Sequence, residues 1–158
     1  MPSVARGRRI KVALVASVGG HTTELLALRR AYEPHPHFYI FNEDIPFEAA
    51  AGVPVYSVVH SERDARVLYN VWEFLRIFRK ERPTVMLSTG AGQAVPAAIA
   101  ARMCGMRVLF VDSVAAVERL SLTGVLMQVL SDGMWVQWPH LAEGREGVQC
   151  QGSIFGSS

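Results

Sequence analysis

The residues best suited to chemistry in this sequence are a histidine and a glutamate that follow a glycine pair. These residues are Gly19, Gly20, His21 and Glu24. They lie where an apolar run, residues 12–18, gives way to a helix-like segment. Glycines let a ligand approach the backbone, and a helix start presents free N–H groups to an anion such as phosphate. Because an imidazole can also accept a proton near neutral pH, the stretch predicts an anion-binding loop that carries a general base.

An ordinary tight turn is the competing interpretation of this stretch. His21 would then be a capping residue and Glu24 would complete a capping box, whereas the anion-binding interpretation has Thr22 or Thr23 as the cap of the helix. Taken alone, the turn is the simpler explanation of the glycine pair and of His21. If the loop binds a ligand, Thr22 is a further candidate for contact with substrate.

A second glycine loop, residues 88–93 (STGAGQ), also stands between a strand-like run and a helix start. Its candidates for contact with substrate are Gly90, Ala91 and Gly92. The loop lacks the G-K-[ST] of a Walker loop and the full G-x-G-x-x-G with a following acid. Nucleoside triphosphate hydrolysis and a self-contained dinucleotide site are therefore disfavoured. A turn that serves only helix–sheet packing remains an open alternative.

A third group of polar residues follows the strand-like run that begins at residue 107. Asp112 is a candidate catalytic carboxylate, and Ser113, Glu118 and Arg119 are candidates for substrate binding. The ordinary alternative is that Asp112 or Ser113 caps the next segment, with Glu118 and Arg119 as a solvated pair.

All three groups follow strand-like runs in an alternating series of strands and helices. Strands are predicted at 11–18, 37–42, 53–59, 84–88, 107–113 and 133–138, and helices at 22–32, 64–81, 94–103 and 121–131. This alternation predicts an α/β fold, a Rossmann-like parallel sheet flanked by helices, with residues 1–158 forming a single domain. Ligands bind at the carboxyl ends of the strands in such sheets, so the three groups should meet there.

Composition narrows the functional classes. The chain is 50% hydrophobic and only 19% charged, which indicates apolar surface covered by a partner or a membrane. The net charge of +2 and the lack of a broad basic stripe argue against nucleic acid. Cys104 and Cys150 have no metal-ligand spacing, so no metal site is expected and a reducing cytosol is the default. No run reaches the roughly twenty apolar residues of a membrane span, which predicts a cytoplasmic protein with peripheral membrane contact at most.

The helix predicted at 64–81 has an apolar sector opposite a basic side. The sector contains Val67, Leu68, Val71, Trp72, Phe74, Leu75 and Phe78. A sector of this width predicts a helix that faces the core. The mixture of aromatic and basic residues also suits a helix at an anionic membrane surface.

Six motifs occur here in the order in which one family has them. They are GGHTTELL, STGAG-x-AVP, VDS, ERLSLTG, SDGMWVQWP and GSIF, within residues 12–155. On these motifs the chain resembles the asparagine-linked glycosylation protein fourteen family and its bacterial exopolysaccharide counterparts. STGAG before AVP and VQWP after SD are specific in combination.

The resemblance implies a subunit of a two-component glycosyltransferase, similar to the amino-terminal domain of a GT-B enzyme such as MurG. A small donor-binding subunit, the protein-thirteen-like partner, would hold most of a UDP-sugar such as UDP-N-acetylglucosamine. This chain would bind a lipid-diphosphate-linked acceptor at the inner face of the membrane, and no cofactor is implied beyond the donor substrate. Two alternatives stay open: a non-catalytic scaffold that recruits the transferase subunit to the membrane, and a free nucleotide-binding enzyme.

The resemblance also implies roles for individual residues. Gly19, Gly20 and His21 match the glycine–histidine loop of the family, and Glu24 matches its following acid. Under this resemblance His21 is the candidate base, with Glu24 or Asp112 orienting it or the acceptor.

Further positions match the family or depart from it. Gly90 and Gly92 match its second loop, and Asp112 keeps a carboxylate where animal members have glutamate before serine. Ala116 stands where the family usually has arginine, which leaves Arg119 as a replacement cation. Val18 replaces a glycine that often precedes the pair.

Overall fold

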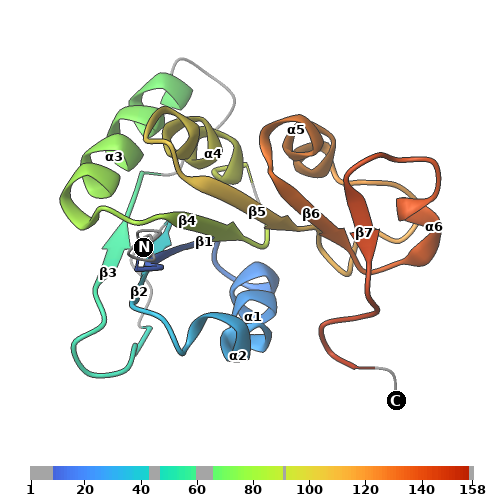
Figure 1. Cartoon of the computed structure of the whole chain (residues 1–158), viewed down its shortest axis with the longest axis horizontal. Helices are drawn as coiled ribbons and strands as arrows, with labels where there is room; N and C mark the ends of the chain where they lie inside the picture. Colours follow the sequence, from blue (N-terminus) through green and yellow to red (C-terminus); the bar gives the residue numbers. More distant parts are fainter. Residues whose placement is uncertain (1–8, 43–46, 60–65, 91, 157–158) are drawn as a thin grey trace, which may run out of the picture.

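One parallel sheet of seven strands forms the centre of the protein. The computed structural model describes residues 9–42, 47–59, 66–90 and 92–156. The strand order is β3-β2-β1-β4-β5-β6-β7, and every neighbouring pair is parallel (Figure 1). The strands are β1 Val12–Ala16, β2 His37–Phe41, β3 Val55–Ser57, β4 Val85–Ser88, β5 Arg107–Val111, β6 Gly133–Val136 and β7 Val148–Cys150.

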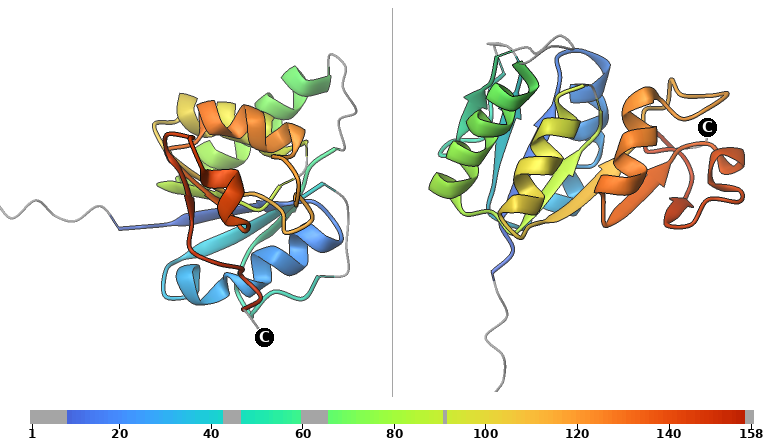
Figure 2. Two further views of the ribbon diagram at one scale, coloured as in Figure 1. Left: turned by 90° about the vertical axis from the view of Figure 1, so that its right-hand side faces the viewer. Right: turned by 90° about the horizontal axis from the view of Figure 1, so that it is seen from above.

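Helices cover both faces of the sheet. Three of them, α3 Arg66–Glu81, α4 Ala94–Met103 and α5 Leu122–Leu130, lie over one face (Figures 1 and 2). The opposite face carries α1 Gly20–Ala27 and α2 Arg29–Tyr32 near the β1–β2 side, and α6 Pro139–Ala142 precedes β7 (Figure 1). All five residues of β1 are buried, as expected for a central strand covered on both faces.

Two apolar clusters hold the layers together. The larger cluster joins the sheet to α3, α4 and α5, with Phe74, Phe78, Phe110 and Met127 at most 2% exposed. The smaller cluster joins the other face of the sheet to α1 and α2. Alternate strand residues belong to different clusters, because successive side chains of a strand point to opposite faces.

The chain order reverses at β1, which fixes the position of the candidate site. From β1 the chain proceeds outward through β2 and β3 on one side, and from β4 through β7 on the other. The loops after β1 and β4 therefore diverge at a topological switch point, where open α/β sheets bind ligands. The predicted Rossmann-like sheet is confirmed, and all three groups of candidate residues follow carboxyl ends of its inner strands.

Several predicted elements differ from those observed. The helix predicted at 22–32 begins earlier, at Gly20, and is divided at Leu28 into α1 and α2. Neither α6 nor β7 was predicted, because a four-residue helix and a three-residue strand are too short for a recognisable apolar period.

The predicted core sector of α3 is wrong for two residues. Leu68 is 76% exposed and Trp72 is 46% exposed. The buried stripe is narrower and consists of Asn70, Phe74, Leu75 and Phe78, and the helix packs against the alanine-rich α4. Within the described residues, no helix is long and apolar enough to cross a bilayer.

Candidate active site

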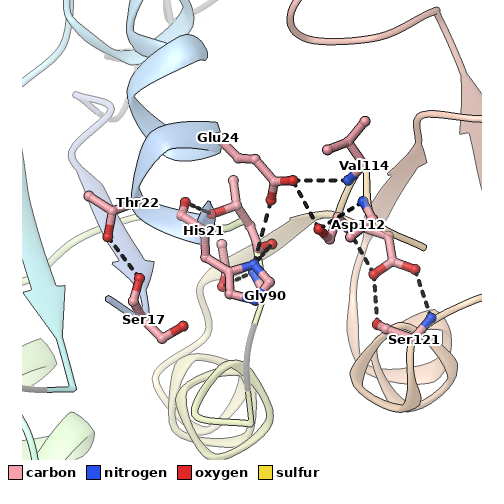
Figure 3. A network of polar contacts seen from close by, with 12 residues as sticks. Ser17, His21, Thr22, Glu24, Gly90, Asp112, Val114 and Ser121 are labelled. Atoms are coloured by element: carbon pink, nitrogen blue, oxygen red, sulfur yellow. Dashed lines mark hydrogen bonds and ion pairs between the residues drawn. The ribbon is translucent and has the colours of Figure 1, made fainter. Parts of the chain in front are cut away.

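The first glycine loop turns directly into α1. Gly19 is the residue before the helix and has φ of 94°, a conformation that favours glycine. The amides of Thr22 and Thr23 donate to the Gly19 carbonyl oxygen, and the Thr22 hydroxyl donates to the Ser17 carbonyl at 2.7 Å (Figure 3). The predicted threonine cap is therefore wrong: Gly19 has the capping position and Thr22 ties the helix back to β1.

His21 is hydrogen-bonded to the second glycine loop. Its Nδ1 lies 3.1 Å from the Thr89 carbonyl oxygen, and the Thr89 hydroxyl donates to the His21 carbonyl at 2.6 Å. Gly90 has φ of 132° and lies against the imidazole ring, where a Cβ atom would come within 2.8 Å of Cε1 and Nδ1. The imidazole ring therefore occupies space that any side chain at position 90 would need, so only glycine fits there (Figure 3).

Glu24 links His21 to the loop after β5. Its side chain is buried, and Oε2 lies 3.5 Å from Nδ1 of His21. Oε1 accepts hydrogen bonds from the Ser113 hydroxyl and the Val114 amide, each at 2.9 Å (Figure 3). Glu24 does not close a capping box, because its carboxylate points across to β5.

The surroundings of His21 select its tautomer. Both neighbours of Nδ1, the Thr89 carbonyl and the Glu24 carboxylate, are acceptors, so Nδ1 carries the proton in the neutral ring. Nε2 then holds the lone pair, and it has no hydrogen-bond partner among the described residues. A base whose second nitrogen is oriented by a carboxylate is the usual arrangement of a catalytic histidine.

The pair also shifts the pKa values of both groups. The Glu24 carboxylate, which accepts from the imidazole, raises the pKa of His21 above its ordinary value of 6.5, against the opposing effect of burial. Burial favours the protonated form of Glu24, but hydrogen bonds from His21, Val114 and Ser113 together lower its pKa below 4.5. An ion pair of imidazolium and carboxylate is thus the favoured state on the acid side of neutrality.

Asp112 holds the start of α5 rather than facing open space. Its side chain is buried, and Oδ1 accepts from the Ser121 hydroxyl at 2.7 Å while Oδ2 accepts from the Ser121 amide at 3.2 Å. Ser121 in turn caps α5 by accepting from the Gly124 amide at 2.8 Å. A Cβ atom on Gly124 would lie 2.5 Å from Oδ2 of Asp112, so the close packing requires glycine.

These contacts enclose an open depression of about 680 Å³ at the carboxyl edge of the sheet. Its lining includes His21, Ser113, Ala116, Glu118, Arg119 and Leu122. Glu118 and Arg119 are exposed on the loop between β5 and α5. The Asp112–Ser121 contact fixes both ends of this loop, which makes Asp112 a positioning residue for the wall of the depression.

The structure brings together most of the predicted site residues. His21, Glu24, Gly90, Asp112 and Ser113 form one continuous network (Figure 3). Ala91 lies outside the described residues.

Two of the predicted glycines have open space around them. A Cβ atom on Gly20 or Gly92 would meet nothing within 4 Å, so folding does not require glycine at either position. Both positions leave room for a ligand to approach the backbone.

Sequence analysis missed Thr89, Ser121 and Gly124 as parts of this network. Ser121 carries a recognisable signal, because a serine directly before an apolar helical run is a typical N-cap. No three His, Cys, Asp or Glu side chains gather as metal ligands in the described ranges.

Replacing Ser121 by alanine is expected to destabilise the protein by about 1–2 kcal/mol, since the buried Asp112 carboxylate and the Gly124 amide both lose a partner. Urea unfolding measures the change. The control is Ser131→Ala at the other end of α5, where the Met127 carbonyl keeps the Ser131 amide at 2.8 Å. Equal effects of the two substitutions would contradict the proposed importance of the cap.

The Glu24–His21 pair predicts a pH-dependent stability. The lowered pKa of Glu24 adds stability that is lost as pH falls below 4.5. The raised pKa of His21 adds stability that is full below 6.5 and is lost as pH rises through the folded-state value. The stability difference between wild type and Glu24→Gln should therefore be larger at about pH 6 than at about pH 9. Thermal unfolding with the exposed Glu33→Gln as control tests this, and a difference independent of pH would contradict it.

Comparison with solved structures defines the class of fold. MurG of Acinetobacter baumannii superposes with a TM-score of 0.71 and 15% identity over 89% of this chain and 45% of MurG. UDP-N-acetylglucosamine 2-epimerase of Rickettsia bellii superposes with a TM-score of 0.71 and 14% identity over 94% of this chain and 46% of the epimerase. The chain spans less than half the length of either protein. Its fold is therefore that of one Rossmann-like half of a GT-B-type protein.

Sequence comparison gives the family. Residues 56–154 match the family described as "Oligosaccharide biosynthesis protein Alg14 like". The UDP-N-acetylglucosamine transferase subunit ALG14 of Rattus norvegicus is 30% identical over 82% of this chain and 76% of its own length. The Mus musculus protein of the same name is 28% identical over 85% of this chain and 78% of its own length. The chain belongs to the Alg14 family.

Proposed function

We propose that this chain is the acceptor-side subunit of a two-component UDP-N-acetylglucosamine transferase. Two relatives that match most of the chain are named as subunits of a UDP-N-acetylglucosamine transferase. The observation that carries the proposal is the His21–Glu24 pair, whose histidine belongs to the lining of an open depression at the switch point of the sheet. The acceptor is a lipid-diphosphate-linked sugar that offers a hydroxyl, in glycan or exopolysaccharide synthesis.

The proposed reaction is an inverting transfer. Nε2 of His21 removes the proton from the acceptor hydroxyl as its oxygen attacks the anomeric carbon of the donor sugar. The new carbon–oxygen bond forms as the bond to the UDP phosphate breaks, and UDP leaves with the electron pair. Glu24 keeps Nδ1 protonated and stabilises the imidazolium that results.

Two features of the depression suit the acceptor diphosphate. The first turn of α1 leaves amide groups of the glycine loop without partners inside the helix, and these can donate to phosphate oxygens. Arg119 is exposed on the loop between β5 and α5, and its guanidinium supplies the positive charge that Ala116 lacks.

The donor-binding partner is proposed to contact the uncovered part of the sheet. An apolar cavity of about 500 Å³ lies there, lined by Leu87, Leu109 and Trp135 and by Ile154 of the carboxyl-terminal segment. Phe155 is 51% exposed beside it. The whole chain then acts as one acceptor-side domain, cytoplasmic and peripheral at the inner face of the membrane.

Reconstitution tests the proposal. The full chain is mixed with its donor-binding partner, UDP-N-acetylglucosamine and a lipid-diphosphate acceptor, and product is measured with each component omitted in turn. The proposal expects product only when both chains are present. Transfer by this chain alone would contradict the two-component assignment. Partner-dependent transfer that survives combined loss of His21 and Glu24 would instead support a non-catalytic scaffold.

A further inference from the structure

We propose that the outer faces of α5 and α3 form a lipid-binding surface that rests on an anionic bilayer beside the candidate active site. The proposal rests on the proposed function in one respect, since it gives the lipid tail of the acceptor a place to remain in the membrane. The surface consists of Leu122, Val125, Leu126 and Val129 of α5 with Leu68, Tyr69 and Trp72 of α3.

The apolar stripe on α5 has no role in the core. Leu122, Val125, Leu126 and Val129 are 68%, 52%, 47% and 82% exposed. Their spacing of three, one and three residues keeps them on one side of the helix, while Gly124 and Met127 face the interior. The helix contains no charged residue, so nothing on it opposes transfer into hydrocarbon.

The stripe is continuous with the candidate active site. Leu122 is both the first residue of α5 and part of the lining of the depression that contains His21. A substrate whose diphosphate lies in the depression therefore has its lipid portion next to an exposed apolar helix. This continuity favours the hydrocarbon of a membrane as the occupant of the stripe.

Aromatic and basic side chains of α3 extend the surface. Tyr69 and Trp72 are 50% and 46% exposed, and the Arg76 guanidinium lies 4.8 Å from the centre of the Trp72 ring. Tryptophan, tyrosine and arginine together are typical of the membrane–water interface, where the rings reach the acyl boundary and the cations reach lipid headgroups.

The charge balance of α3 favours an anionic surface. All four basic residues of the helix are exposed: Arg66, Arg76, Arg79 and Lys80. Both carboxylates are held within the protein instead. Glu81 pairs with Lys11 at 2.6 Å, and Glu73 accepts from Asn70 at 3.2 Å. Exposed cations beside exposed apolar groups bind phosphatidylglycerol-like headgroups better than they bind neutral headgroups.

The arrangement of the helices lets both parts contact one plane. α3, α4 and α5 lie side by side over one face of the sheet, with α4 between the other two (Figures 1 and 2). Near its end α4 exposes Met103, which is apolar, and Arg102, whose guanidinium pairs with Asp132 at 3.3 Å. The cavity on the opposite face has an apolar lining without lysine or arginine, which suits a protein partner instead.

Vesicle binding tests the proposal. The full chain is floated with vesicles of phosphatidylcholine and phosphatidylglycerol in equal parts, and with phosphatidylcholine alone. The Val125→Ser/Val129→Ser variant should bind the mixed vesicles about tenfold more weakly than wild type, because two apolar contacts are lost. Arg76→Gln/Arg79→Gln should lose binding to the mixed vesicles only. Val55→Ser, on the edge strand β3 and 41% exposed, is the matched control and should bind as wild type does.

Three outcomes would overturn the proposal. In the first, the wild-type protein fails to float with vesicles, and in the second, the Val125→Ser/Val129→Ser variant floats as well as wild type does. In the third outcome, that variant floats normally but no longer co-purifies with the donor-binding partner. Thermal unfolding of each variant excludes loss of fold as the cause of weak binding. Transfer to a short-chain, water-soluble acceptor separates this inference from the proposed function. The Val125→Ser/Val129→Ser variant should still transfer sugar to the water-soluble acceptor. If the wild-type protein does not transfer sugar to it, the proposed function is contradicted, but the flotation result still tests the lipid-binding surface.

Discussion

Replacement of His21 by alanine is expected to lower kcat for sugar transfer by roughly 10²- to 10⁴-fold in the complex with the donor-binding subunit. The loss follows from the removal of Nε2, the lone-pair nitrogen of a ring that Thr89 and Glu24 hold in one tautomer. Initial rates at saturating donor and acceptor measure the effect. KM should change little, because the acceptor diphosphate is bound by the loop amides and not by the ring.

The matched control is His37→Ala, which removes an imidazole at the start of β2, away from the depression. Thermal unfolding and co-purification with the partner establish that both variants fold and assemble. Near-normal transfer by His21→Ala would mean that another group, in this chain or in the partner, accepts the proton. Equal losses in both variants would assign the effect to folding.

Replacement of Gly90 by alanine is expected to destabilise the protein by about 1–3 kcal/mol and to reduce transfer together with it. A φ of 132° is strained for alanine, and the new methyl group would lie 2.8 Å from the imidazole of His21. The ring must then leave its position between Thr89 and Glu24. Urea unfolding and initial rates measure the two effects.

Gly92→Ala distinguishes this steric effect from the general cost of replacing a loop glycine. A Cβ atom at Gly92 meets nothing within 4 Å, so stability should be unchanged. If Gly92→Ala destabilises the protein as much as Gly90→Ala does, the loop backbone requires glycine, and the contact between Gly90 and the imidazole is not the cause. A loss of transfer alone in Gly92→Ala would instead indicate contact of this loop with substrate.

The fold was predictable because its signals are local. Continuous apolar runs such as residues 12–18 identify buried parallel strands, and glycine or proline marks where each strand or helix ends. The convergence of three loops at one sheet edge then follows from topology alone. The alanine-rich helix Ala94–Met103 was predicted with its observed limits for the same reason.

The role of each site residue was less predictable, because it depends on contacts between distant segments. The local sequence around Glu24 allows its carboxylate either to complete a capping box or to reach the loop after another strand. Only the position of Ser113 in the folded protein decides between these two contacts. Asp112 likewise depends on Ser121, nine residues later. The sequence pattern alone therefore kept the binding and structural interpretations of both carboxylates open.

The exposed side of α3 illustrates a second limit. A helical wheel shows which residues share a side, but the width of the buried stripe depends on the neighbouring helix. In the core beside the alanine-rich α4, Phe74, Leu75 and Phe78 are buried, whereas Leu68 and Trp72 stay outside. Leu68 and Trp72, which the broad apolar sector wrongly assigned to the core, are residues of the proposed membrane-facing surface.

The pH dependence of kcat/KM for the reconstituted transferase tests whether His21 is the base that Glu24 orients. We expect an acid limb set by His21 with a pKa above 6.5, because Glu24 favours the protonated ring. Glu24→Gln should move that limb to lower pH, and His21→Ala should abolish it. An acid limb that is the same in wild type and Glu24→Gln and persists in His21→Ala would contradict the assignment of His21 as the base oriented by Glu24.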